Sequence, residues 1–102
     1  MDDHLPRLEE LIAEAVSILR RHNVTFWADW LDGDLKRIQE RDPAGLDHLL
    51  SAYGGMGSLP DVVVSPQNGH TISENDVEAV NDRLLRIVSE IYDHTRIVRR
   101  AL

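Results

Sequence analysis

Apolar residues recur at three- and four-residue steps in four segments of the chain, which is the spacing of helices that bury one face. The first segment runs from Leu5 to about His22, and the second runs from Thr25 to about Arg41. A short third segment carries Leu46 to Tyr53, and the most regular segment extends from about Glu74 to Arg99. We therefore expect a mainly α fold in which residues 1–102 form a single four-helix bundle-like domain.

The helix ends are marked by residues with strong positional preferences. Asp42 and Pro43 end the second segment and suit the cap and first turn of the third. Ser73, with Asp76 three residues later, resembles a capping box at the start of the last helix. Gly33 lies inside the second segment, where we expect it to allow a close helix approach or to relax the helix locally.

The connection between the third and fourth helices interrupts the helical pattern. Val62–Val64 favours an extended chain, and Asn68-Gly69 is a strong short-range signal for a hairpin. We expect a small two-stranded β-ribbon here, with Asp61–Ser65 paired to His70–Ile72. Such a ribbon is marginal alone, so it should pack on the helices.

Composition narrows the class of protein. Hydrophobic residues make up 42% and charged residues 28% of 102 residues, which is ordinary for a globular domain. Cysteine is absent, which excludes disulfides, thiol catalysis and thiolate metal sites. The net charge of −7, from 18 acids and 11 bases, is opposite to that of a phosphate-binding protein, so we expect no nucleic acid partner.

The N-terminal sequence Met1-Asp2-Asp3-His4 is acidic where a signal peptide would be basic. No apolar run approaches the roughly 20 residues that a membrane span needs. We therefore expect a cytoplasmic location and no membrane partner.

Candidate metal and catalytic sites do not emerge from the sequence. The five histidines are scattered without an i, i+4 pair, and the acids near Gly33 do not fit a calcium loop. We therefore expect no metal, no cofactor and no catalytic residue, and we interpret Asp29, Asp32 and Asp34 as a solvated acidic face.

The glycine-rich turn Gly54-Gly55-Met56-Gly57-Ser58 allows a structural and a functional interpretation. It lacks the lysine of a phosphate loop and the G-x-S-x-G order of a nucleophile elbow, so a structural turn is favoured. The alternative is an interaction or ligand loop that brings Ser58 near two further polar residues. This candidate loop comprises Gly54, Gly55, Met56, Gly57, Ser58, Asp61 and His70.

Two further surfaces are candidates for protein contacts. Trp27 and Trp30 lie three residues apart on one side of a helix, where they serve either the core or a binding hot spot. The candidate partner surface comprises Trp27, Asp29, Trp30, Asp32 and Asp34. On the last helix, the apolar stripe is wider than one neighbour covers, which predicts a homodimer seam at Ile91, His94 and Val98.

Two sequence runs carry a family resemblance: WADWL at 27–31 and HLLSAYGGMGSLPDVVV at 48–64, with NGH at 68–70. The chain resembles a family of small uncharacterised bacterial proteins that share a Y/F-G-G-M-G-S turn and a following aliphatic strand. The likeness covers about residues 26–95, although Pro60 departs from the polar residue expected there. It implies a bacterial origin and no particular activity.

These observations favour a non-enzymatic protein-interaction domain. Its most specific version is an immunity or antitoxin-like protein whose acidic surface covers a basic toxin. The partner would be a basic protein or a second copy of the chain. The alternatives are a small-ligand-binding or enzymatic domain at the glycine-rich turn, and a structural homodimeric subunit.

Overall fold

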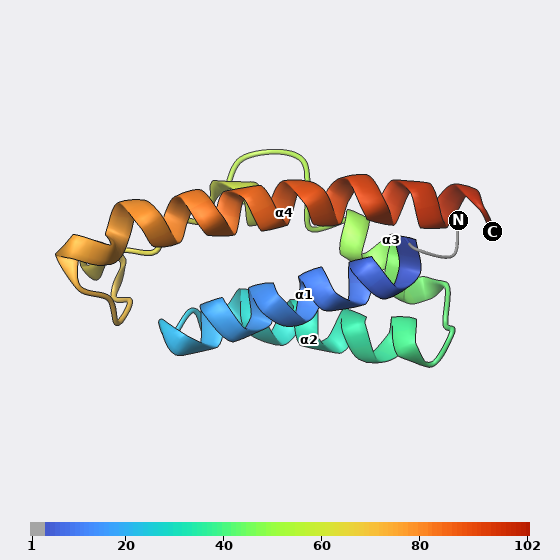
Figure 1. The fold of residues 1–102 in the computed structure, drawn as a ribbon, viewed down its shortest axis with the longest axis horizontal. Helices are drawn as coiled ribbons and strands as arrows, with labels where there is room; N and C mark the ends of the chain where they lie inside the picture. Colours follow the sequence, from blue (N-terminus) through green and yellow to red (C-terminus); the bar gives the residue numbers. More distant parts are fainter. Residues whose placement is uncertain (1–3) are drawn as a thin grey trace.

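A computed structural model describes residues 4–102 of the chain, and these residues form helices and loops (Figure 1). Residues 1–3, on which the expectation of a missing signal peptide depends, lie outside the described residues. The elements in chain order are α1 (His4–Arg21), α2 (Thr25–Gln39), α3 (Ala44–Leu50), the 3₁₀ turns η1 (Leu59–Asp61), η2 (Pro66–Asn68) and η3 (Glu74–Asp76), and α4 (Val77–Arg100). The predicted helical bundle is thus confirmed at the level of its four helices.

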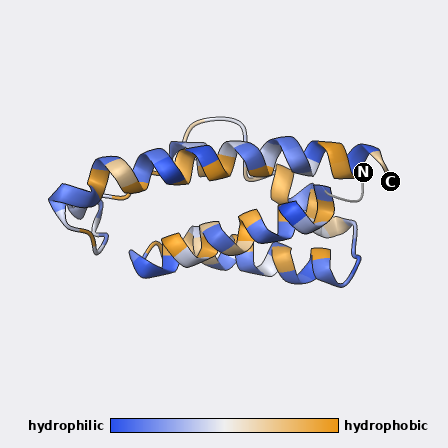
Figure 2. Ribbon diagram, viewed as in Figure 1, coloured by the Kyte–Doolittle hydropathy of each residue, from blue (hydrophilic) through white to orange (hydrophobic). Residues whose placement is uncertain are grey.

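Helix α1 is the centre of the bundle because it packs against both α2 and α4. Its apolar stripe is buried between them, as the inward-facing hydrophobic residues in Figure 2 illustrate. Helix α4 is the longest at 24 residues. Helix α3 packs against both α2 and the C-terminal half of α4. The molecule is elongated along these helices, at 42 × 23 × 21 Å. Within residues 4–102, no helix is both long and apolar enough to cross a membrane.

Two residues after each of α1 and α2, the chain adopts the left-handed conformation, at Asn23 with φ 63° and at Arg41 with φ 62°. After α2, the Asp42 N–H donates to the Arg37 carbonyl at 2.9 Å, a bond typical of this kind of helix end. Glycine usually occupies such a position and asparagine is tolerated there. Arg41 is therefore an unusual choice.

Helix α3 begins as the sequence predicts and packs closely on α2. Asp42 Oδ1 accepts the Ala44 N–H at 3.0 Å, which confirms the predicted cap. The close approach expected at Gly33 is wrong, because a Cβ there would meet nothing within 4 Å. It is Gly45 that allows helix contact, since a Cβ at this position would lie 2.8 Å from Arg37 Cβ.

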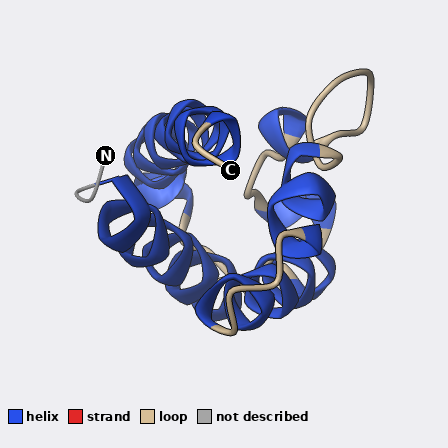
Figure 3. Ribbon diagram, turned by 90° about the vertical axis from the view of Figure 1, so that its right-hand side faces the viewer, coloured by secondary structure: helices blue, strands red, loops and turns tan. Residues whose placement is uncertain are grey.

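The predicted β-ribbon is wrong, because residues 4–102 contain no strand (Figure 3). The turn itself does form: Gly69 is left-handed at φ 80°, and the His70 N–H donates to the Ser65 carbonyl at 3.1 Å. Pro66–Asn68, however, is a 3₁₀ turn. The predicted four-residue connection, residues 66–69, thus turns the chain as expected, but the segments on either side of it do not pair as strands.

The flanking segments separate because each finds another hydrogen-bond partner. The Val64 N–H donates to Asn81 Oδ1 of α4 at 2.7 Å, and Asn81 Nδ2 donates to the Val64 carbonyl at 2.9 Å. On the other side, the Thr71 N–H donates to the His22 carbonyl at 3.0 Å, and His22 Nδ1 lies 2.8 Å from the Thr71 carbonyl. The Asn81 side chain of α4, and the backbone and side chain of His22 just after α1, thus take the place of a pairing strand.

The last helix starts slightly later than expected. Residues Glu74–Asp76 form a separate 3₁₀ turn before α4 begins at Val77. Ser73 caps this turn, because its hydroxyl accepts the Asn75 N–H at 3.3 Å. The serine half of the predicted capping box is thus confirmed, but it caps a 3₁₀ turn, and within residues 4–102 the Asp76 side chain makes no cap hydrogen bond that would complete the box.

Candidate functional site

Four aromatic rings form a continuous row over α2 and α3, and we name this row the aromatic surface: Phe26, Trp27, Trp30 and His48. The Phe26 and Trp27 rings meet nearly at right angles, with their centroids 5.0 Å apart. The Trp27 and Trp30 centroids are 5.1 Å apart, and Trp30 stacks on His48 at 4.3 Å and 18°. Each ring thus supports the next.

The phenylalanine and tryptophan rings of this row are more exposed to solvent than core side chains are. Phe26 is 65% exposed, whereas Trp27 and Trp30 are half-buried against the core. Sequence analysis identified the two tryptophans but missed Phe26. The signal was present, because Phe26 precedes Trp30 by four residues and so lies on the same side of the helix.

A buried carboxylate holds the last ring of the row. Asp34 Oδ1 lies 2.5 Å from His48 Nδ1, and the Asp34 side chain is 1% exposed while that of His48 is 40% exposed. Burial raises the pKa of Asp34, although the hydrogen bond with His48 and the nearby charges of His48 and Arg37 oppose that increase. Asp34 is therefore not part of an exposed acidic face, which corrects its place in the predicted partner surface.

The Asp34–His48 pair can present a fixed imidazole to a binding partner. His48 Nδ1 is hydrogen-bonded to Asp34, and the His48 ring stacks on Trp30, so the position and the orientation of the imidazole are both fixed. Within residues 4–102, no hydroxyl is hydrogen-bonded to His48 Nε2, so the other member of a nucleophilic triad is absent from this pair. The pair therefore offers a rigid polar contact at the end of the aromatic surface.

An open groove of about 440 Å³ adjoins the Phe26 end of the aromatic surface. Its walls are the turn and first residues of α2 at 23–27 and two parts of the long connection, Asp61–Val63 and Asn68–His70. Val63 on its rim is 51% exposed. The groove thus brings Asp61 and His70 of the predicted ligand loop beside Trp27 of the predicted partner surface.

The glycine-rich turn is conformationally demanding. Gly54, Gly55 and Gly57 all have positive φ, at 98°, 91° and 78°. Side chains rarely adopt this conformation, so the structure explains why three glycines occur in four residues. Met56 at the tip is fully exposed.

The polar residues of the candidate ligand loop have separate partners. Ser58 Oγ donates to the Gly55 carbonyl at 2.8 Å, and the Gly57 N–H donates to Asp61 Oδ2 at 2.9 Å. His70 Nδ1 accepts the backbone N–H of Ser65 at 3.2 Å. These bonds fasten the connection to itself, so the alternative of a catalytic group at the turn has no hydrogen-bonded assembly behind it.

The remaining acids of the predicted partner surface are paired with basic side chains. Arg20 contacts Asp29 at 3.0 Å and Asp32 at 3.5 Å, and Lys36 contacts Asp32 at 3.4 Å. Such exposed pairs add little stability. Within residues 4–102, no three histidine or acidic side chains are grouped so that they could hold a metal ion.

The predicted dimer seam lies inside the chain's own core. Ile91 is 0% and Val98 is 4% exposed, so the chain's own core already covers both side chains. His94 Nδ1 lies 2.9 Å from His4 Nδ1 of α1, which also places it at an internal contact. The wide apolar stripe of α4 is thus covered mainly within the monomer, and this corrects the seam.

One family model matches the chain: a domain of unknown function, DUF6966, over residues 20–73. This range contains the whole aromatic surface, Asp34, the glycine-rich turn and the walls of the groove. It leaves out α4 and nearly all of α1. No curated protein and no solved structure shows significant similarity to the chain.

Proposed function

The chain belongs to the DUF6966 family of domains of unknown function, and we propose that it is a non-enzymatic protein-interaction domain. Its binding site would be the aromatic surface together with the groove beside Phe26. The partner would be a basic protein.

The observation that carries this proposal is the exposure of Phe26 at the end of a supported aromatic row. Half-buried tryptophans next to an exposed apolar ring are typical of the anchors that dominate protein interfaces. Burying the exposed part of Phe26 on a partner would contribute about 1–2 kcal/mol. Val63, across the groove, extends the same apolar area.

The charge of the chain supports a basic partner. The net charge is −7, and Asp61 lines the groove. Complementary charge speeds association and contributes specificity. In its most specific version, the proposal is a bacterial, cytoplasmic immunity or antitoxin-like protein that covers a basic toxin, with the Tyr53–Ser58 turn as a family signature.

The test compares two variants that each replace an exposed apolar residue. Phe26→Ser alters the aromatic surface, whereas Leu85→Ser replaces a 52% exposed residue on α4 and serves as the matched control. Proteins bound to the wild-type chain in extracts of the source organism are identified, purified and titrated against all three forms. Binding is followed by acrylamide quenching of tryptophan fluorescence, since both tryptophans of the chain lie in the aromatic surface.

We expect Phe26→Ser to weaken binding by about tenfold or more, and Leu85→Ser to leave it unchanged. The partner should protect the tryptophans from acrylamide, and raising the salt concentration should slow association. Equal binding by Phe26→Ser and the wild type would contradict the proposal. So would a partner that leaves quenching unchanged.

A further inference from the structure

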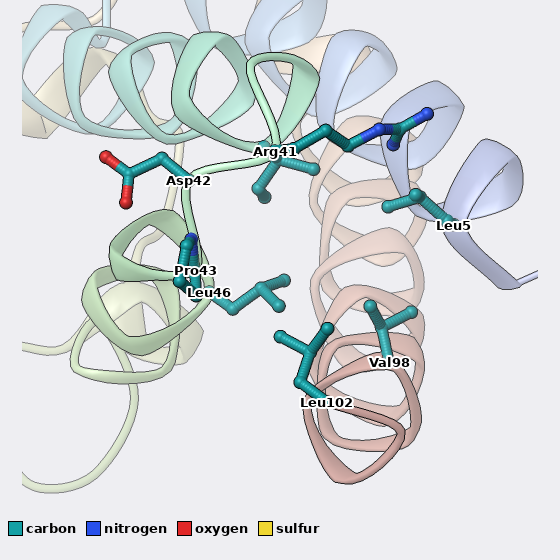
Figure 4. Close-up of a pocket in the computed structure, with 8 residues that line it drawn as sticks. Leu5, Arg41, Asp42, Pro43, Leu46, Val98 and Leu102 are labelled. Carbon is teal, nitrogen blue, oxygen red and sulfur yellow. The ribbon is translucent and has the colours of Figure 1, made fainter.

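A second cavity, of about 260 Å³, lies at the opposite end of α2 from the groove, where α2 turns into α3 (Figure 4). Leu46 of α3 and Val98 and Leu102 at the end of the chain point toward one another across it, and Leu5 of α1 forms its far side. Ile38 and Pro43 complete the apolar part of the lining. Such a concave apolar site with a few polar groups is typical of small-ligand sites.

One cation lies at the rim of this cavity. The Arg41 side chain extends along the rim toward Leu5, while the Asp42 carboxylate points away from the cavity. Asp42 already accepts the Ala44 N–H, and none of the ion pairs formed among residues 4–102 involves Arg41. The rim therefore has a guanidinium available for an anionic group.

The backbone of Arg41 shows that this side chain is held there against local preference. Its φ of 62° is left-handed, at a helix end where glycine is the usual residue. The equivalent position after α1 is Asn23, which adopts this conformation far more readily. A long-chain residue whose backbone keeps this uncommon conformation beside a cavity points to a role for its side chain.

We propose that this cavity binds a small straight-chain carboxylate, with the alkyl chain inside and the carboxylate paired with Arg41. A cavity of about 260 Å³ with an aliphatic lining suits a small alkyl chain. Guanidinium groups pair with carboxylates through two parallel hydrogen bonds, which gives the head group its specificity. The site is independent of the proposed protein interface, which lies at the other end of α2.

The probes are octanoate and, as its uncharged match, 1-octanol, both titrated into the full chain and followed by NMR. The variants are Arg41→Gly, Arg41→Lys and, as a control for loss of an arginine elsewhere, Arg86→Ala on α4. Melting temperatures are measured for each variant. Arg41→Gly should melt at or above the wild-type temperature, because glycine suits the left-handed position.

We expect saturable octanoate binding, with shift changes at Leu5, Leu46, Val98 and Leu102. Arg41→Gly should weaken octanoate about tenfold and leave 1-octanol unchanged, while Arg41→Lys retains most of the affinity and Arg86→Ala all of it. The proposal is overturned if octanoate does not saturate by about 5 mM, if the shifts map elsewhere, or if Arg41→Gly binds octanoate like the wild type. None of these outcomes depends on the partner proposed for the aromatic surface.

Discussion

Asp34 is the residue whose environment departs most from its chemical preference. It lies in the buried stripe of α2, four residues after Trp30 and four before Ile38, and its second oxygen Oδ2 has no hydrogen-bond partner within residues 4–102. Burying a carboxylate is unfavourable unless it is paired, and His48 supplies the close partner. Asp34 thus fixes the end of the aromatic surface at some cost in stability.

This cost predicts a pH dependence for Asp34→Asn. Because burial raises the pKa of Asp34, the folded chain binds its proton more readily than the unfolded chain does. The wild type should therefore gain stability relative to Asp34→Asn as the pH falls from 7 through that raised pKa. Denaturant unfolding at pH 7, 6, 5 and 4 measures the difference, with Asp29→Asn as the control for an exposed carboxylate. A wild-type advantage that grows with rising pH would contradict the prediction.

A second residue-scale prediction contrasts two glycines. Gly57→Ala places a side chain at φ 78° and should lower the free energy of unfolding by about 1 kcal/mol or more. Gly33→Ala lies within α2, has no atom within 4 Å of the new Cβ, and should raise it by up to about 1 kcal/mol. Denaturant unfolding of the two variants measures both changes, and a Gly57→Ala variant as stable as the wild type would refute the conformational role of the turn.

At the scale of elements, the connection between α3 and α4 is held on α4 by side-chain hydrogen bonds made from both partners. Asn81 bonds both the N–H and the carbonyl of Val64 and also donates to the Val77 carbonyl at 2.7 Å. Tyr53 Oη donates to the Val88 carbonyl at 2.7 Å and packs beside Tyr92. These contacts take the place of strand pairing and position one wall of the groove.

Asn81→Ala should therefore detach the segment around Val64. It leaves a buried N–H and carbonyl without their partner, which costs about 2 kcal/mol. Hydrogen exchange at the Val64 amide should accelerate together with the loss of stability. Asn75→Ala, an exposed asparagine just before α4, is the matched control. Unchanged exchange at Val64 in Asn81→Ala would show that the segment is held by other contacts.

The same elements show what the sequence could reveal. Periodicity located all four helices, because a buried face leaves a repeating local signal. It could not reveal that Asn81 would bond Val64, since the two are seventeen positions apart and the contact depends on tertiary packing. Periodicity also shows that a face is buried without showing what buries it. Ile91 and Val98 therefore suggested a dimer seam, although α1 and the chain's own core cover them.

The site was predictable to a similar degree. Trp27 and Trp30 were recognised as a pair, and the structure adds Phe26 and His48 to them. Asp34 was placed on the surface because charged residues usually are, although its spacing from Ile38 put it on the buried side. For Asp34, its spacing from Ile38 is thus a better guide to burial than its charge.

At the scale of the whole molecule, α1 and α4 support a segment that carries the proposed interface. The family match covers residues 20–73, whereas α1, which packs on both α2 and α4, lies almost entirely outside it. The matched segment therefore depends on helices beyond its bounds for much of its core. Variants that probe the interface should consequently be made in the full chain.

The most direct test of the proposed interface is site-specific photocrosslinking in the full chain. Benzoylphenylalanine replaces Phe26 in one form and Leu85 in another, and each is irradiated with the purified partner. The proposed interface predicts a crosslink to the partner from position 26 and none from position 85. A crosslink from position 85 with none from position 26 would place the interface on α4 and contradict the proposal.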